Sequence, residues 1–419
     1  MKISQVIGRE IYDSRGWPTV QCELVLENEI SFTSSVPSGL SRGRYEAREL
    51  RDGGKRLWGM GVLQAIEHIE HTISPELIDK ELNALEMDQI IINLDGTDDK
   101  SHLGANATLA VSMSLYRAQA YLEQIELFEL IAHLFGNESV SLPFPFFNVI
   151  NGGLHAQNNL KIQEFMIVPV GAVNFRESME IATTAFHELK NILQRTGLST
   201  TVGDEGGFAP HNVNDLQVLD ILVEVLEKLE VQYGNRCVLA LDIAASRFYD
   251  PATRTYTLDN KHFNSEQMIN WYLDLISNYP IFSIEDGLAE DDVIGWQSLT
   301  QEFSDKIQIA GDDLFATNYF RIEQGIEHKW ATAAIIKPNQ IGTVLQTLQA
   351  IKLCKQNEMN VIVSHRSGET EDTFIADLAV GTNAGQIKTG GCSRSEHIAK
   401  YNRLLYIEDH LMSNSELED

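Results

Sequence analysis

Short runs of consecutive apolar residues alternate, from about residue 238 onward, with longer stretches in which apolar residues recur every three or four positions. The runs are VLALD, IFSIED, IQIAGDD, AAIIKPN, NVIVSHR and GQIKTGG, and stretches such as NSEQMINWYLDLISNY and GTVLQTLQAIKLCKQN lie between them. Continuous apolar runs are typical of parallel strands buried on both faces, and the longer stretches indicate amphipathic helices. The pattern predicts repeated strand and helix units in either a doubly wound sheet or a (β/α)8 barrel.

A different pattern precedes these units. Up to about residue 60, the segments TVQCELVL and SFTSSV predict short strands, and PSGLSRG predicts a glycine-containing loop. From Trp58 to about Phe135 the spacing of apolar residues predicts helices. The segment GNESVSLPFPFFNVINGG, which contains two prolines, then marks a domain boundary. We therefore expect a smaller α+β N-terminal domain over residues 1–136 and a larger α/β domain over residues 137–419.

Length and composition agree with this division. The chain has 419 residues, more than one hydrophobic core usually contains, and 43% of them are apolar. Its 60 acidic and 32 basic residues give a formal charge of −28, which argues against a nucleic acid or an anionic membrane as the main partner. The four cysteines lack CxxC or CxxH spacing, which predicts a reducing, cytoplasmic location. No apolar run predicts a signal peptide or a membrane span.

Each of the six apolar runs ends in a residue whose side chain can take part in catalysis or binding. These residues are Asp242, Glu285, Asp312, Lys337, His365 and Lys388, at intervals of 43, 27, 25, 28 and 23 residues. In a barrel the carboxyl ends of all strands meet at one mouth, where barrel enzymes have their active sites, and doubly wound sheets bind ligands at the same edge. A charged residue after one strand also arises because strands end at solvent, but six in succession favour a functional site.

Three of these residues are carboxylates: Asp242, Glu285 and Asp312. Oxygen ligands without accompanying histidine or cysteine favour Mg²⁺ or Mn²⁺ over zinc. Without a cation, carboxylates crowded at one mouth would repel one another and have raised pKa values. The alternative is that the three residues cap strands or pair with lysines.

Two lysines, Lys337 and Lys388, are expected on strands beside those that carry the three carboxylates. A lysine is a base at neutral pH only when its pKa is lowered, and an adjacent cation and partial burial would lower it. Salt bridges to the carboxylates are the alternative. His365, Arg366 and Ser367 are consecutive and suited to holding a phosphate or carboxylate through charge-assisted hydrogen bonds.

Two stretches near the start of the larger domain add further candidates. TVGDEGGFAP places Glu205 among glycines that allow close approach of the backbone, and NGGLHAQNNLKIQEF contains His155, Gln163 and Glu164. If Glu164 and Glu205 lie together, they could share a proton, and one of them would remain protonated as a general acid. Their spacing alone does not decide this.

Long motifs over nearly the whole chain resemble those of the enolase family, in the same order. They are DSRGWPT, VPSGLSRGRYEA, ELRDG, LDGTDDKSHLGANA, NVINGGLHA, QEFMIVP, VGDEGGFAP, LALDIAAS, SIEDG, GDDLFATN, IKPNQIGT, SHRSGETEDTFIADLAVG and QIKTGG. The resemblance implies a small α+β domain on a barrel that begins ββαα and continues as βα units. It also implies a glycolytic lyase that reversibly dehydrates 2-phospho-D-glycerate to phosphoenolpyruvate, with two Mg²⁺ ions, or Mn²⁺, in the active site.

The resemblance also implies residue roles. The metal ligands would be Asp242, Glu285 and Asp312 for the first Mg²⁺ and Ser41 for the second. Lys337 resembles the base that takes the C2 proton, and Glu205, with Glu164 as its partner, resembles the acid that assists departure of the C3 hydroxyl. The substrate-contacting positions would be His155, Gln163, His365, Arg366, Ser367 and Lys388, of which His365 and Lys388 also count as catalytic.

The chain departs from the family pattern in the loop that closes over the substrate. Leu40 and Arg42 replace Ala and Thr of the usual PSGAST, and farther on Arg247 replaces the glutamate of AASEF. Loop closure excludes water and completes the site, so bulkier residues bear on turnover and substrate fit. They motivate an alternative function, that of an enolase-like paralogue acting on a related phosphorylated or phosphonate hydroxy acid.

Two further departures concern assembly. Gln21 stands where the family usually has an acid and Tyr406 where it has an arginine, and in the family these positions face each other across a dimer interface. Two neutral residues predict a repacked contact, because a single unpaired charge would cost more than replacing both. We expect a homodimer or a dimer-based higher oligomer. A binding role separate from catalysis is a further alternative, although the C-terminal SNSELED lacks the lysines associated with plasminogen binding in enolases.

Overall fold

The structure is a computed structural model and describes residues 1–39, 43–234, 237–258 and 261–415. An antiparallel three-stranded sheet forms the centre of the N-terminal domain. Its strands, in spatial order, are β1 (Ile3–Tyr12), β2 (Pro18–Leu26) and β3 (Ser31–Ser35). Alternate residues of β2, such as Val20, Cys22 and Leu24, are fully buried, as expected for a sheet with one covered face.

Helices cover this sheet and continue toward the larger domain. They are η1 (Arg56–Gly59), α1 (Leu63–His68), η2 (Ile69–Ile73), α2 (Ser74–Leu77), α3 (Ala84–Asp95), α4 (Ala105–Glu123) and α5 (Leu127–Phe135). The last part of the helical pattern predicted up to about Phe135 is divided, because Gln124 ends α4 with a left-handed φ of 58°. A non-glycine residue in this conformation is not predictable from the spacing of apolar residues.

The larger domain is a closed eight-stranded barrel with the strand order β10-β11-β12-β13-β14-β4-β5-β6. The strands are β4 (Phe144–Asn151), β5 (Glu164–Val168), β6 (Val238–Asp242), β10 (Ile281–Glu285), β11 (Gln308–Gly311), β12 (Ala333–Ile336), β13 (Asn360–Ser364) and β14 (Gly385–Lys388). Strand β5 is antiparallel to both β4 and β6, and the other pairs are parallel. Closure excludes the doubly wound sheet and confirms a barrel that begins ββαα.

The barrel helices are α6 (Phe175–Arg195), α7 (Asp215–Tyr233), α8 (Ser265–Asn278), α9 (Val293–Phe303), α10 (Tyr319–His328), α11 (Val344–Gln356), α12 (Phe374–Gly381) and α13 (Ser395–Ser415). Several begin at an asparagine: the side chains of Asn174, Asn214 and Asn264 each accept a hydrogen bond from the backbone N–H three residues later. Shorter elements complete the domain: η3 (Gly153–His155), η4 (Ala245–Phe248), β7 (Tyr249–Asp250), β8 (Thr255–Leu258), β9 (Lys261–Phe263) and η5 (Pro338–Gln340).

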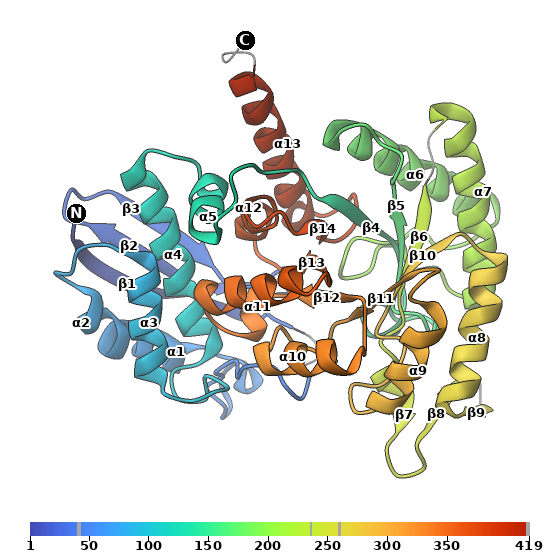
Figure 1. Cartoon of the computed structure of the whole chain (residues 1–419), viewed down its shortest axis with the longest axis horizontal. Coiled ribbons are helices and arrows are strands. Elements are labelled where there is room, and N and C mark those ends of the chain that lie inside the picture. Colours follow the sequence, from blue (N-terminus) through green and yellow to red (C-terminus); the bar gives the residue numbers. More distant parts are fainter. Residues whose placement is uncertain (40–42, 235–236, 259–260, 416–419) are drawn as a thin grey trace.

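Small and large apolar side chains fill the inside of the barrel. They are Phe146, Met166, Val168, Ala240, Ala310, Ala333, Ile335 and Ile362. Because this interior is packed, ligands have access only at the ends of the barrel. The N-terminal domain, coloured blue to teal in Figure 1, lies beside the barrel, and its helix α4 contacts η5 and α11.

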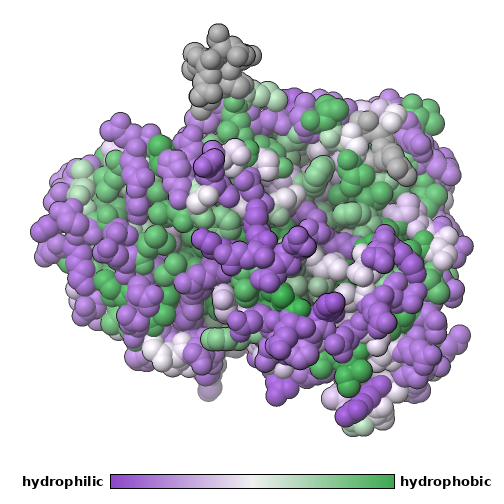
Figure 2. Space-filling model, in the orientation of Figure 1, coloured by the Kyte–Doolittle hydropathy of each residue, from purple (hydrophilic) through white to green (hydrophobic). Residues whose placement is uncertain are grey.

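Hydrophilic residues cover much of the face shown in Figure 2, and hydrophobic residues appear there as separate patches. A surface of this kind accords with the formal charge of −28. Within the described residues, none of the helices combines the length and the apolar character needed to cross a membrane.

Candidate active site

Polar side chains occupy the inward-facing positions at the carboxyl-terminal mouth of the barrel. Successive side chains of a strand point to opposite faces, so Asp242 shares the inward face with Ala240, and Lys337 shares it with Ile335. Glu285 is opposite Asp242 in the ladder between β10 and β6. The packed barrel interior therefore ends in a layer of carboxylates and lysines.

A small cavity lies at this mouth. Its lining comprises Glu46, His155, Gln163, Glu164, Glu205, Asp242, Asp312, Asp313, Lys337, His365, Arg366, Ser367 and Lys388. Glu285 is joined to this set through Lys388. The convergence of the strand ends predicted from the sequence is thus confirmed. The predicted ligand Ser41 and its neighbours Leu40 and Arg42 lie outside the described residues.

Lys388 is the buried cation at the centre of the carboxylates. Its amine lies 2.8 Å from both carboxylate oxygens of Glu285, 3.0 Å from Oε1 of Glu164 and 3.4 Å from Oδ2 of Asp242. Burial alone would lower the pKa of Lys388, but the surrounding carboxylates raise it well above its ordinary value. Lys388 is therefore a fixed positive charge and not a base.

Lys337 lies on the other side of the metal-ligand candidates. Its amine donates to Oδ2 of Asp312 at 2.5 Å, and Gln340 donates to the other oxygen at 3.2 Å. Burial favours a low pKa for Lys337, but the Asp312 carboxylate outweighs it and the pKa is raised. Lys337 is thus paired with a carboxylate, as the salt-bridge alternative predicts, and the lowered pKa expected beside a bound cation stays a prediction.

Asp242 and Glu285 end the neighbouring strands β6 and β10, Asp312 directly follows the next strand, β11, and all three carboxylates are buried. Burial, followed by the charge of Asp242, raises the pKa of Glu285 to about 8. The amines of Lys337 and Lys388 lie among these oxygens. The groups of possible metal ligands whose atoms all lie within 4.8 Å of one another are other combinations of the described residues, and not these three carboxylates together. Buried oxygen donors on neighbouring strands whose charges destabilise one another fit a hard divalent cation.

Asp286, the second acid of IFSIED, accepts backbone hydrogen bonds, whereas its neighbour Glu285 pairs with Lys388. Its carboxylate accepts the backbone N–H groups of Asp312 at 2.8 Å and Asp313 at 3.0 Å. The residue has a left-handed φ of 44°, and burial followed by the charge of Asp313 raises its pKa well above the ordinary value. Asp286 thus fixes the turn that presents Asp312, a role that the sequence did not indicate.

Glu164 and Glu205 form the acidic pair predicted from the sequence. Together with His155, they have atoms that all lie within 4.8 Å of one another. Burial and the charge of Glu205 raise the pKa of Glu164 well above its ordinary value. Burial would also raise the pKa of Glu205, but His155, at 3.6 Å, and then His365 lower it. These opposite directions favour a single proton shared by the pair, and Asn148 donates to Glu205 at 3.0 Å.

The segment after β13 presents Arg366 and Ser367 to the cavity. The Arg366 guanidinium donates to Glu46 of the N-terminal domain at 2.9 Å and to Asn339 at 3.3 Å. Arg15, also from the N-terminal domain, donates to the Ser367 hydroxyl at 3.4 Å. Glu46 and Asn148 were not predicted as site residues, although Glu46 stands in the quoted motif VPSGLSRGRYEA.

Three residues that depart from the family pattern lie within the described part of the chain, and each forms hydrogen bonds to other residues of the chain. Arg247 donates to the backbone carbonyls of Lys161 at 2.7 Å and Ala244 at 3.3 Å, so its positive charge joins two loops at the mouth. Gln21 donates to the Ser35 hydroxyl at 3.0 Å, and the half-exposed Tyr406 donates to Glu126 at 3.2 Å. Both neutral residues thus have partners within the chain.

A closed barrel with buried acids, bases and fixed cations at its carboxyl-terminal mouth defines an α/β-barrel enzyme with acid–base chemistry. The model of the enolase C-terminal TIM barrel domain matches residues 139–418, and the model of the enolase N-terminal domain matches residues 3–131. The enolase of Ehrlichia chaffeensis is 48% identical over 408 residues, which cover 97% of this chain and 96% of that protein. The chain therefore belongs to the enolase family, as the motifs indicated.

Proposed function

We propose that this lyase catalyses the reversible dehydration of 2-phospho-D-glycerate to phosphoenolpyruvate, a step of glycolysis. One observation carries the assignment. In the strand order of the barrel, Lys337 follows β12 and Glu164 begins β5, four strands away in a ring of eight. The base Lys337 and the acidic pair of Glu164 and Glu205 therefore face each other across the cavity, an arrangement suited to removal of a proton and a hydroxyl from adjacent carbons.

The bond changes follow from this arrangement. Lys337, as the free amine, takes the proton from C2, and the electrons of the C–H bond move into the substrate carboxylate. These electrons then return to form the C2–C3 double bond as the C3 hydroxyl departs. Glu205 passes the proton of the Glu164–Glu205 pair to that hydroxyl, which leaves as water. In the reverse direction the same groups exchange roles.

Fixed positive charge supports the first of these changes. Removal of a proton beside a carboxylate puts additional negative charge on that group, and the permanently protonated Lys388 stabilises it. His365 is fully buried, and burial lowers its pKa well below the ordinary value, so it contacts the substrate as a neutral imidazole. Arg366 and Ser367 bind the phosphate, and His155 and Gln163 position the rest of the substrate.

A divalent cation fits this function. Asp242, Glu285 and Asp312 would hold one Mg²⁺ or Mn²⁺ ion, and Ser41, outside the described residues, would contribute to a second. When bound, such ions supply positive charge that stabilises the developing negative charge of the substrate and neutralises the carboxylates around the two lysines. Release of Asp312 from Lys337 would lower the pKa of that lysine, as a base requires.

Formation of phosphoenolpyruvate from 2-phospho-D-glycerate, followed by ultraviolet absorbance during titration with Mg²⁺ and Mn²⁺, tests the proposal. Turnover that depends on the cation is expected, and its absence from the folded protein would exclude the function. The paralogue alternative rests on Leu40 and Arg42, outside the described residues, and a faster reaction with a phosphonate hydroxy acid would support it.

We also propose the domains 1–136 and 137–419, a cytoplasmic location, and a homodimer or dimer-based oligomer. Sedimentation would test the oligomeric state.

A further inference from the structure

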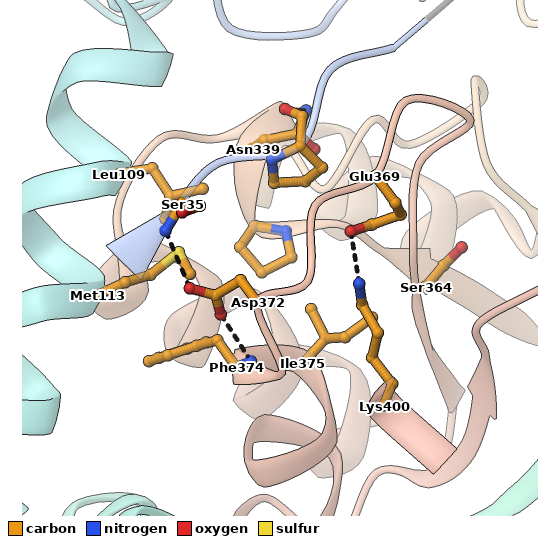
Figure 3. A pocket seen from close by; sticks show the side chains of 12 residues that line it. Ser35, Leu109, Met113, Asn339, Ser364, Glu369, Asp372, Phe374, Ile375 and Lys400 are labelled. Carbon is orange, nitrogen blue, oxygen red and sulfur yellow. Dashed lines mark hydrogen bonds and ion pairs between the residues drawn. The ribbon is translucent and has the colours of Figure 1, made fainter. Parts of the chain in front are cut away.

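A second small cavity lies between the two domains (Figure 3). Helix α4 contributes Leu109 and Met113 to it, and α12 contributes Phe374. In the wall of this apolar cavity, Glu369 and Lys400 point toward each other and form an ion pair with an N–O distance of 2.8 Å (Figure 3). Their side chains are 3% and 1% exposed, so the pair is almost completely removed from water.

Every polar atom of this pair has a defined partner in the chain. One carboxylate oxygen of Glu369 accepts the backbone N–H of Arg366 at 3.0 Å, and the other accepts that of Thr370 at 3.1 Å as well as the Lys400 amine. Lys400 also donates to the carbonyl oxygens of Thr370 and Glu396, both at 2.6 Å. Buried charges are stable only when hydrogen bonds and opposite charges offset the loss of water. One of the hydrogen bonds that does so here joins Glu369 to the backbone N–H of Arg366.

The same segment is also attached to the N-terminal domain. The backbone N–H of Glu369 donates to the Ser14 hydroxyl at 3.1 Å, and its carbonyl accepts from the Ser14 N–H at 2.8 Å. Gly368 and Ser38 exchange two backbone hydrogen bonds, at 2.7 and 2.9 Å. A Cβ atom at Gly368 would lie 2.4 Å from Oδ2 of Asp13, so the contact requires glycine. Glu369 thus lies where three separate segments meet.

We propose that Glu369 and Lys400 are positioning residues that hold the Arg366 backbone in the orientation that binds the substrate phosphate. The inference rests on the proposed function, but it concerns residues that do not line the active-site cavity. The phosphate does not react, and loss of a contact made equally to ground state and transition state raises KM with little change in kcat. A merely structural role would instead change stability and leave KM unaltered.

Four variants test the proposal. Glu369→Gln and Lys400→Met remove one charge each, and Lys400→Arg is the conservative replacement. Asp372→Asn is the matched control, because Asp372 forms a buried ion pair with Arg117 at 2.7 Å on the same cavity. Loss of a charge-assisted hydrogen bond predicts a KM for 2-phospho-D-glycerate raised about tenfold in Glu369→Gln and Lys400→Met, with kcat changed less than about threefold. Lys400→Arg should keep KM within about threefold of the wild-type value, and Asp372→Asn should lower the melting temperature without changing KM.

Calorimetric titration with inorganic phosphate in magnesium buffer provides a readout that does not need turnover. Glu369→Gln and Lys400→Met should bind phosphate about tenfold more weakly than wild type and Asp372→Asn do. If both variants lose stability but keep wild-type KM and phosphate affinity, or if kcat falls more than KM rises, the proposal is overturned. Absence of turnover in the wild type would exclude the proposed function, and the phosphate titration would still decide the positioning role.

Discussion

The amine of Lys388 lies 2.8 Å from both carboxylate oxygens of Glu285, with both side chains buried at the barrel mouth. The same amine contacts Glu164 and Asp242. One lysine thus offsets the charges of carboxylates from three strands, and the stability of this end of the barrel depends on it.

Replacing Lys388 with methionine, which has a similar shape and no charge, should therefore destabilise the protein strongly. Breaking a buried ion pair by removing one partner typically costs about 3–5 kcal/mol. Urea denaturation at neutral pH in the presence of a chelator measures this loss. Lys352→Met, at an exposed position of α11, is the control. A change of less than about 1 kcal/mol in the Lys388 variant would contradict the central role of its charge.

Addition of Mg²⁺ to chelator-treated protein should raise the melting temperature, because the cation replaces repulsion among Asp242, Glu285 and Asp312 with attraction. At an ion concentration 100 times the Kd, the stabilisation would be about 2.7 kcal/mol. Asp242→Asn should lose most of this increase, whereas Asp305→Asn, at an exposed acid in the loop before β11, should retain it. Equal increases in both variants would show that Mg²⁺ binds elsewhere.

Lys337→Met should abolish most of the turnover while leaving substrate binding nearly intact, since Lys337 contacts Asp312 and no group assigned to the phosphate. The loss of a general base predicts a kcat lower by about 10³- to 10⁴-fold. Exchange of the C2 proton of 2-phospho-D-glycerate with deuterated solvent isolates the step and should disappear as well. Persistence of this exchange would assign the base to another residue, and Lys352→Met again serves as the control.

Much of this site could be predicted from the sequence because barrel units are local. Each apolar run fixes a strand, and the residue after it must lie at the mouth, as Asp312 and Lys337 do. The pairing of charges could not be predicted in this way. Whether Lys337 is paired or free depends on the directions of side chains from different strands, which the order of residues along the chain does not specify.

Contacts between segments that are distant in the sequence could not be predicted from the sequence pattern either. Glu46 and Arg366 are separated by 320 positions, and their ion pair follows from the docking of one domain on the other. Glu285 and Asp286 are adjacent acids, yet one faces the barrel interior and the other caps a turn, because β10 ends at Glu285 and Asp286 turns the backbone with a left-handed φ of 44°. A pattern of acids alone does not distinguish the two.

Asp88 supplies a pH-dependent contribution to stability that is independent of the active site. It lies on α3, is fully buried, and accepts the backbone N–H of Leu345 at the start of α11 at 2.8 Å. Burial raises the pKa of Asp88 from its ordinary 3.8 to about 6. Between these two values the folded state retains a proton that the unfolded state releases, so stability falls as the pH rises. Above the upper value the full loss, about 3 kcal/mol, is present.

Asp88→Asn should therefore remove this slope and stabilise the protein at pH 8, by at most about 3 kcal/mol. Its carbonyl oxygen can still accept the Leu345 N–H, and its amide can donate to the neighbouring hydroxyls of Ser112 or Tyr116. Urea denaturation between pH 4 and pH 8, with Asp305→Asn as the control, measures the difference. A variant that is less stable than wild type at pH 8, or that shows the wild-type slope, would mean that the ionised carboxylate is well solvated or paired in the folded state.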